Sequence, residues 1–185
     1  MKKGELIKLI LLAVATAASP EAVFAGFIGT AILTAPLDRW YRRQDKNGKY
    51  RVRKKFAELQ REKLIEVSET PDGKTKVALT ESGKKKVLQY QFEDLKITPL
   101  KKWDKKWRMV IFDIPEPYKR ARETLRAKLR ELGFHQLQKS VFVHSQECRN
   151  EIEFVVEFLG VSPYVRMAEV SRFDGDDELR SRFFR

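Results

Sequence analysis

The sequence predicts an α+β protein with two domains in its 185 residues. Two observations carry this prediction. In each half, stretches with apolar residues at helical spacing are followed by stretches that alternate apolar and polar residues, as strands do. Between the halves, residues 96–107 combine a proline, dense charge and two tryptophans, which is typical of a linker. We therefore expect domains at residues 1–95 and 108–173, joined by the linker at 96–107 and followed by a C-terminal tail at 174–185.

The chain starts with a basic and then apolar stretch, as an export signal does. Its longest uncharged run before Glu21, residues 9–20, has 12 residues and ends in a proline. A bilayer span needs about 20 apolar residues. We therefore expect residues 4–18 to form the first buried helix of a cytoplasmic protein, with export or membrane anchoring as the alternative. Residues 22–36 either pack in the domain or form an interaction surface. The buried stripe of the first helix would consist of Leu6, Ile10, Ala13 and Ala17.

A strongly cationic region follows. Residues 39–63 contain 11 basic and 3 acidic residues, and the whole chain has a net charge of +12 and a pI near 9.8. Val52, Phe56 and Leu59 recur at helical spacing, which predicts a helix over residues 50–63 with one apolar face and a cationic remainder. Such a charge balance favours a polyanionic partner, either nucleic acid or an anionic membrane surface.

The period then changes to two in residues 65–67 and again in residues 77–79, and the turn Pro71-Asp72-Gly73 joins the two stretches. This pattern predicts a β-hairpin. Thr80 has the residue type of an N-cap, and a helix to about Leu95 follows it. Helix, basic helix, two-stranded wing and helix is the order of a winged helix-turn-helix. In that fold the second helix enters the major groove and the wing touches the flanking backbone.

The Leu79-Thr80-x-x-Gly83 step after the hairpin resembles winged-helix transcription regulators, as does the basic, leucine, isoleucine run at the end of the cationic helix. This resemblance implies double-stranded DNA as the partner, with no cofactor required for DNA binding. The DNA-binding candidates are cations of the helix and the wing, namely Arg51, Arg53, Lys54, Lys55, Arg61, Lys74 and Lys76.

The second half begins with an apolar stretch, RMVIFDI, which predicts a strand that ends at Asp113. Residues 115–133 predict a helix, because a proline suits its first turn and a glycine suits its end. The apolar face of this helix would consist of Tyr118, Ala121, Leu125, Leu129 and Leu132.

The rest of this half continues the alternation of helices and strands. Residues 134–145 are extended, as one bent strand or two short ones. Asn150 with Glu153 forms a candidate capping box for a second helix, and YVRMAEV predicts the last strand. Strand, helix, strands, helix, strand is the ferredoxin-like order (βαββαβ). The open face of such a sheet favours a homodimer through this domain.

VIFDIP, an arginine-rich helix, a Leu-Gly pair and LQKSVFV follow one another between residues 107 and 170. This succession resembles the CRISPR-associated protein two family, with Phe112 in place of the usual tyrosine. Repressors of the phenylacetate-catabolon (PaaX) type are similar over more of the chain. They place a winged helix before a domain of this kind, and their central strand ends in an Asp-Ile-Pro step. The positions that match the CRISPR-associated family are Asp113, Arg120, Arg122, Gln138, Ser140, Val141 and Phe142.

The residue inventory limits the chemistry of a site. Cys148 is the only cysteine and the chain has two histidines, so an intrachain disulfide, a cysteine zinc site and a histidine-rich metal site are excluded. A metal would need carboxylates, which suits Mg²⁺ or Mn²⁺. Asp113 is the candidate catalytic residue and metal ligand, and the resemblance to the CRISPR-associated family implies that a dimer supplies two copies. The alternative is that Asp113 caps the following helix or bonds the turn, and we expect Ser140, His135, His144 and Cys148 not to be catalytic.

Two function classes follow from these predictions. The first is a dimeric DNA-binding transcriptional regulator that reads a two-fold site. The second is a magnesium-dependent endonuclease, or the non-catalytic adaptor of a spacer-integration complex with a CRISPR integrase as its partner. The fused winged helix favours the first class, and LQKSVFV favours the second. A membrane-associated protein is a third alternative, which depends on the opening segment alone.

Overall fold

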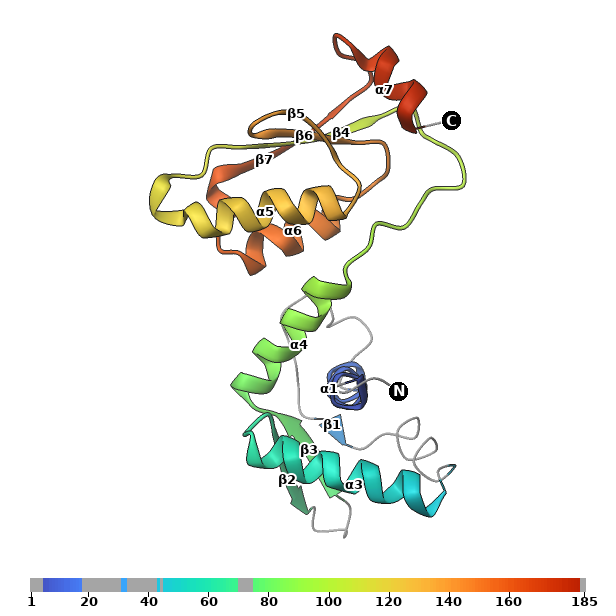
Figure 1. Ribbon diagram of the computed structural model, residues 1–185, viewed down its shortest axis with the longest axis vertical. Helices are drawn as coiled ribbons and strands as arrows, with labels where there is room; N and C mark the ends of the chain where they lie inside the picture. The colour runs from blue at the N-terminus through green and yellow to red at the C-terminus, as the bar shows by residue number, and fades with distance from the viewer. Residues whose placement is uncertain (1–4, 18–30, 33–42, 44, 70–74, 184–185) are drawn as a thin grey trace. The chain divides into compact units, whose positions relative to one another are not determined.

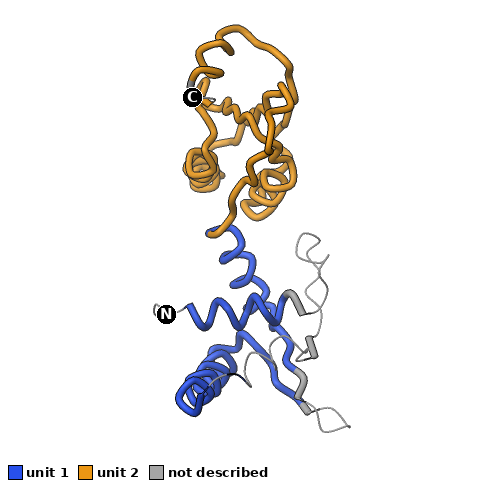
Figure 2. Tube along the Cα trace, turned by 90° about the vertical axis from the view of Figure 1, so that its right-hand side faces the viewer, with its two compact units in different colours: residues 1–93 blue, residues 94–185 orange. Residues whose placement is uncertain are grey.

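The computed structural model describes residues 5–17, 31–32, 43, 45–69 and 75–183. The chain divides into two compact units, unit 1 (Met1–Glu93) and unit 2 (Asp94–Arg185), which Figure 2 draws in different colours. Residues 22–36 lie outside the described residues apart from the pair 31–32. Across the described ranges, no helix is long and apolar enough to cross a membrane.

The described part of unit 1 contains helices and a three-stranded sheet (Figure 1). The helices are α1 (Glu5–Ala17), α3 (Lys46–Arg61) and α4 (Glu81–Asp94). The strands are β1 (Ala31–Ile32), β2 (Ile65–Glu69) and β3 (Thr75–Leu79), arranged in the order β1-β3-β2. The predicted hairpin is present as the antiparallel pair β2 and β3, and β1, which was not predicted, pairs with β3.

The core of unit 1 forms around α1, which spans nearly the predicted residues. The buried residues of α1 are Leu6, Ile10, Leu11, Val14 and Ala15. Leu6 and Ile10 match the predicted stripe, whereas Ala13 is only half-buried and the side chain of Ala17 lies outside the described residues. Because α1 is apolar on nearly all sides, its pattern does not determine which face is buried. Contacts with β3 and α3 select the face that carries the larger side chains.

Helix α3 begins four residues earlier than the predicted start at Tyr50. The carboxylate of Asp45 accepts a hydrogen bond from the backbone N–H of Gly48 at 2.6 Å, which is an N-cap. The predicted start followed from the spacing of apolar residues, of which Val52 is the first. The N-cap at Asp45 determines where the helix starts. Val52 and Leu59 are buried, as predicted.

Unit 2 shows the predicted βαββαβ succession. Its strands are β4 (Trp107–Phe112), β5 (His135–Gln138), β6 (Val141–His144) and β7 (Val165–Val170). Its helices are α5 (Lys119–Glu131), α6 (Arg149–Phe158) and α7 (Asp176–Phe183), and short 3-10 turns at Glu116–Tyr118 and Ser162–Tyr164 precede α5 and β7. The sheet is antiparallel with the order β5-β6-β4-β7, which is the ferredoxin-like arrangement.

Helices α5 and α6 cover one face of this sheet (Figure 1). Leu125 and Leu129 of α5 are fully buried, and Gly133 follows the helix with φ +88°, so both match the prediction. Tyr118 does not belong to the buried face, because it lies in the 3-10 turn before α5 and is 45% exposed. Its ring instead contacts that of Tyr164, with the centroids 5.6 Å apart.

The predicted capping box at the start of α6 is wrong. The helix begins at Arg149 rather than after Asn150, and no side chain of its N-cap residue bonds the first turn. The backbone N–H of Arg149 donates to the carboxylate of Glu147 at 3.1 Å. Because this carboxylate precedes the helix and already supplies an acceptor, the helix starts before Asn150 and Glu153 can form a box.

The other face of the sheet carries a second apolar cluster, which includes α7. Trp107 and Val143 are fully buried and pack with Leu179 of α7. The indole N–H of Trp107 donates to the buried carboxylate of Asp176 at 3.3 Å. Residues 174–185 were expected to form a tail, but α7 belongs to the core of unit 2. Its eight residues are too few and too charged to show a helical period in the sequence.

Candidate nucleic-acid interface

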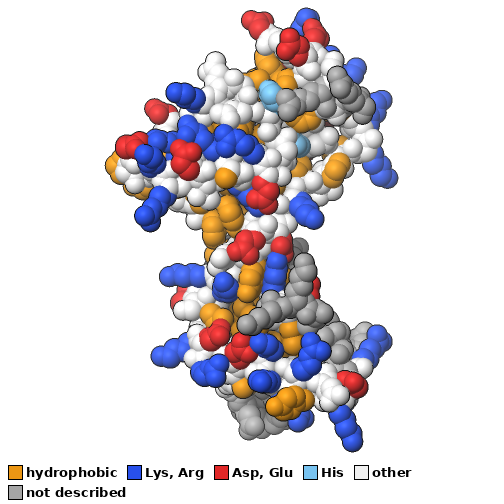
Figure 3. All heavy atoms as spheres, in the orientation of Figure 1, with side chains coloured by type: hydrophobic (Ala, Val, Ile, Leu, Met, Phe, Trp, Pro, Cys, Tyr) orange, Lys and Arg blue, Asp and Glu red, His pale blue; other side chains and the backbone are white. Residues whose placement is uncertain are grey.

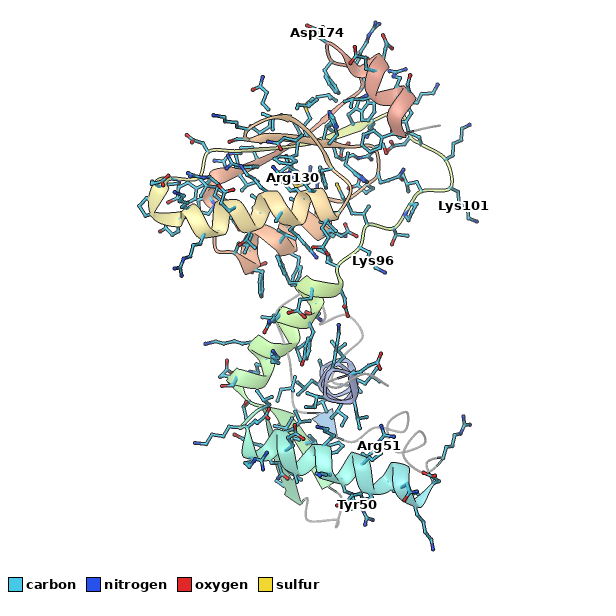
Figure 4. All side chains as sticks on the ribbon, in the orientation of Figure 1. Tyr50, Arg51, Lys96, Lys101, Arg130 and Asp174 are labelled. Carbon is cyan, nitrogen blue, oxygen red and sulfur yellow. The ribbon has the colours of Figure 1, made fainter. Side chains whose placement is uncertain are left out.

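The solvent-facing side of α3 carries a row of exposed side chains. The row lies on the side of the helix opposite Val52 and Leu59. We call it the outer row of α3, and it consists of Lys46, Tyr50, Lys54, Ala57 and Arg61. Lys and Arg side chains gather over this part of unit 1 (Figure 3), and Figure 4 labels Tyr50 and Arg51 on α3. Tyr50 is 68% exposed, so its ring and hydroxyl are available to a partner.

The cations of α3 differ in whether they already have an acidic partner. Lys55 forms an ion pair with Glu58 at 2.6 Å, and this hydrogen bond lowers the pKa of Glu58 below its usual value. Arg51, Lys54 and Arg61 are exposed and form no ion pair with any described carboxylate. Their charge is therefore available to an external anion.

Of the other DNA-binding candidates, one is fully described and two belong to the wing. Arg53 is exposed on α3. Lys76 lies in β3, where its Cα pairs with that of Ser68, and its side chain lies outside the described residues. Lys74 also lies outside them. The candidates that the structure brings together on one helix are therefore Arg51, Arg53, Lys54, Lys55 and Arg61.

Sequence reasoning missed Lys46, Tyr50 and Ala57 of the outer row. The candidates were chosen by charge, which ignores an aromatic ring and a small side chain, and the late helix start excluded Lys46. Asp45 followed by Gly48 is the signal that locates the true start, because an acidic N-cap satisfies a free N–H of the first turn.

The end of α3 is held against the start of α4 by Thr80. Its hydroxyl donates to the carbonyl of Lys63 at 2.5 Å and accepts the N–H of Gly83 at 3.0 Å, so Thr80 caps α4 as predicted. Its own N–H donates to the carbonyl of Leu64 at 3.1 Å. A Cβ on Gly83 would lie 2.0 Å from that same carbonyl oxygen, so only glycine permits the approach. The Leu-Thr-x-x-Gly step therefore determines how α3, the hairpin and α4 meet.

Asp113 directly follows β4 and is exposed. Its backbone N–H donates to the carbonyl of Tyr164 at 3.0 Å. Neither the 3-10 turn nor α5 has a side-chain cap, so the expectation that Asp113 caps the following helix is wrong. Within the described residues, no group of three His, Cys, Asp or Glu side chains could hold a metal ion. The described residues of one copy therefore do not provide the carboxylate ligands that a Mg²⁺ or Mn²⁺ site needs.

The other motif residues of unit 2 have structural contacts. Arg122 donates to the carbonyl of Ile114 and to the carboxylate of Glu116, both at 2.9 Å, and so closes the loop between β4 and α5. Phe142 is fully buried and stacks on Phe112, with ring centroids 5.9 Å apart.

The remaining motif positions lie at the surface of unit 2. The carbonyl of Ser140 accepts the N–H of Phe112 at 3.0 Å, just before β6 begins. Gln138 ends β5 at an exposed position, after a register shift from Gln136. The side chain of Arg120 is exposed, and its carbonyl accepts the hydroxyl of Thr124 at 2.9 Å. Among the described residues, no hydrogen bond or ion pair joins these side chains to Asp113.

Cys148 and His144 are both buried, and burial shifts the pKa of each side chain. Burial raises the pKa of the Cys148 thiol to about 12, so it stays protonated at neutral pH. Burial lowers the pKa of His144 below its usual value, so its imidazole is neutral. Its Nδ1 accepts the N–H of Gln146 at 3.0 Å, which is a structural contact.

Arg108 in β4 is buried, with 3% of its surface exposed, and sequence reasoning did not predict this. Its guanidinium pairs with Asp104 at 2.5 Å and with Glu147 at 2.8 Å. The bond to Arg108 lowers the pKa of Asp104, so that carboxylate remains charged. Arg108 therefore fastens the segment before β4 and the loop after β6 to the sheet.

The fold and these contacts define an α+β protein with an exposed cationic helix in unit 1 and a ferredoxin-like unit 2. Residues 100–181 match the family model described as "PaaX protein central Cas2-like domain". Unit 2 is therefore similar to the central Cas2-like domain of PaaX proteins, which confirms the resemblance to PaaX-type proteins and to the CRISPR-associated protein two family. A search of curated proteins found no match.

Proposed function

We propose that the protein is a dimeric, PaaX-like transcriptional regulator that binds double-stranded DNA through unit 1. In this proposal unit 1 is a winged helix, α3 is its recognition helix and the hairpin β2–β3 is its wing. The strand order β1-β3-β2 and the position of α3 directly before the hairpin support this assignment. The match of unit 2 to a PaaX domain supports the regulatory role.

The observation that carries the proposal is the outer row of α3. Recognition helices contact base edges with their N-terminal residues, and here Lys46 and Tyr50 belong to the first turns. Ala57 is small, which lets the helix backbone approach the groove, and Lys54 and Arg61 reach on either side of it. Lys54 and Arg61 form no ion pair with a carboxylate of the described residues, although the charge of Glu58 is near both. Long donors on an exposed helix are what a major groove or its phosphates bind.

A homodimer through unit 2 would present two copies of α3 to a two-fold DNA site. The sheet face that carries Trp107 is covered by α7 at one end only. At the other end, Ile111 of the central strand β4 is 40% exposed. Its cross-strand neighbours Val141 and Arg166 are half-buried and exposed. An exposed apolar position on a central strand suits burial against a second copy.

The test is selection of bound duplexes from a random DNA library, followed by titration of the selected duplex with variants. Arg51→Ala with Lys54→Ala should lower the affinity at least about tenfold. The slope of the logarithm of the association constant K against the logarithm of the salt concentration should become shallower by about 2. Lys84→Ala with Lys85→Ala removes the same charge from α4 and should change the affinity little. Recovery of no preferred sequence, or equal behaviour of the two double variants, would contradict the proposal.

A second candidate function is the metal-dependent endonuclease or integrase adaptor. The observation that favours it is the exposed Asp113 carboxylate, which forms no hydrogen bond or ion pair with a described residue. Because one copy does not fit a metal site, this function needs two copies of Asp113 at a dimer interface. Magnesium-dependent cleavage of DNA that disappears in Asp113→Asn would support the nuclease. Cleavage that persists in this variant would indicate a contaminant.

A further inference from the structure

The segment between α4 and β4 is rich in lysine. It contains Lys96 and, within residues 101–106, four further lysines and one acid, Asp104. We call residues 101–106 the lysine turn. Asp104 does not neutralise these lysines, because both of its carboxylate oxygens accept from Arg108, at 2.7 and 2.5 Å. The turn therefore presents a concentrated positive charge.

The lysine turn is anchored to unit 2 rather than free in solution. The rings of Trp103 and the buried Trp107 lie 5.1 Å apart between centroids, and the indole N–H of Trp103 donates to the carbonyl of Lys106 at 3.0 Å. The guanidinium of Arg180 in α7 lies over the Trp103 ring at 5.4 Å. Just before the turn, the N–H of Leu100 donates to the side chain of Gln146 at 2.7 Å. The inward residues of the turn thus hold its backbone in one place.

The lysines of the turn point outward. Lys106 pairs with Glu169 at 3.0 Å. Lys101, Lys102 and Lys105 are exposed and form no ion pair with any carboxylate that the structure describes. Figure 4 shows Lys101 at the outer bend of the segment, with its side chain directed away from the sheet.

The backbone of the lysine turn is left-handed at Lys105. Its φ is +64°, in the left-handed region that favours glycine. A lysine there is less favourable than a glycine, because its Cβ crowds the backbone. The N–H of Lys106 donates to Asp104 at 3.1 Å, which closes the tight turn that requires this conformation.

We propose that Lys101, Lys102 and Lys105 bind the phosphate backbone of the same DNA that unit 1 recognises. The proposal rests on the proposed function, which brings a polyanion to the chain. Three unpaired cations on an anchored turn lose little conformational freedom when they meet phosphates, so the contact adds affinity that does not depend on base sequence. Unit 2 thereby contributes directly to DNA binding in addition to its role as a dimerisation domain.

The test uses the full chain, the duplex selected for it and a scrambled duplex of equal length. The variant is the triple Lys101→Ala, Lys102→Ala and Lys105→Gly, in which glycine suits the left-handed position and protects the fold. We expect the affinity for both duplexes to fall by the same factor, at least about tenfold at low salt, and the slope of log K against log salt to become shallower by about 3. The urea midpoint of the triple variant should not fall.

The matched control removes three cations that already have acidic partners and so lowers the net charge equally. These are Lys84, Lys119 and Arg149, which pair with Glu81, Glu116 and Glu153. If the lysine-turn variant behaves like this control, the proposal is wrong even though Arg51→Ala with Lys54→Ala still lowers the affinity. If the wild-type chain binds neither duplex, the proposed function itself fails and this proposal falls with it.

Discussion

Gly83→Ala tests how α3 is held in unit 1. The added Cβ would lie 2.0 Å from the carbonyl oxygen of Leu64, whereas ordinary contacts lie at 3.4–4 Å. The atom that it meets belongs to the backbone, so no side-chain rotation relieves the overlap. Overpacking of this kind destabilises by up to about 3 kcal/mol, whereas alanine is better than glycine in a helix by about 1 kcal/mol. We therefore expect the free energy of unfolding of unit 1 to fall by about 2 kcal/mol.

The measurement is urea unfolding of the full chain followed by far-UV circular dichroism. Hydrogen exchange across β2 and the start of α4 assigns the change to this junction. Ser82→Ala is the control, because Ser82 is the exposed neighbour of Gly83 and its replacement should change the stability by less than about 0.5 kcal/mol. If Gly83→Ala instead stabilises the chain by about 1 kcal/mol, the helix propensity of alanine alone explains the change. Such a result would refute the close approach of Gly83 to the carbonyl of Leu64.

Three further predictions concern stability. Lys63→Gly should raise the free energy of unfolding of unit 1 by up to about 1 kcal/mol in urea titrations, because Lys63 lies just after the end of α3 with φ +54°; a loss would contradict the left-handed conformation. Leu179→Ala should destabilise unit 2 by at least about 2 kcal/mol, measured by tryptophan fluorescence, and no effect would place α7 outside the core. Burial lowers the pKa of His144 in the folded state, so the unfolded state binds a proton there more readily. Unit 2 should therefore lose stability as the pH falls from 7.5 through 6.5 towards the lowered folded pKa. His144→Asn should flatten this dependence of stability on pH.

The fold of unit 2 is predictable because its signals are local and strong. Residues 109–112 (MVIF) are an unbroken apolar run, as in a central strand, and Leu125 and Leu129 repeat at helical spacing. Gly133 ends α5 because the chain there adopts a left-handed conformation. The same reasoning fails where a boundary depends on a cap, as at Asp45 and Glu147, because many polar residues near a helix start could serve as the acceptor.

The misses in the rest of the chain have a tertiary cause. The orientation of α1 depends on which of its many apolar side chains fit β3 and α3. Helix α7 is stable through Leu179 and Asp176, which contact Trp107 far away in the sequence. In the candidate interface, the sequence identified the basic cations but not Tyr50 or Ala57, because exposure on a helix face follows from the true helix start and from which face is buried.

The motif residues of unit 2 indicate the fold of this domain but do not specify its function. Arg122 donates through its two terminal nitrogens to Ile114 and Glu116, and Phe142 is buried against Phe112, so both side chains have structural contacts. The motif therefore marks a ferredoxin-like domain that is compatible with a nuclease, an adaptor or a repressor. The side chains that the fold does not use are the informative ones. Among the described residues they include the cations of the outer row of α3 and of the lysine turn that form no ion pair. Because both units carry such cations, the two proposals together predict that DNA affinity depends on both units, with base discrimination confined to α3.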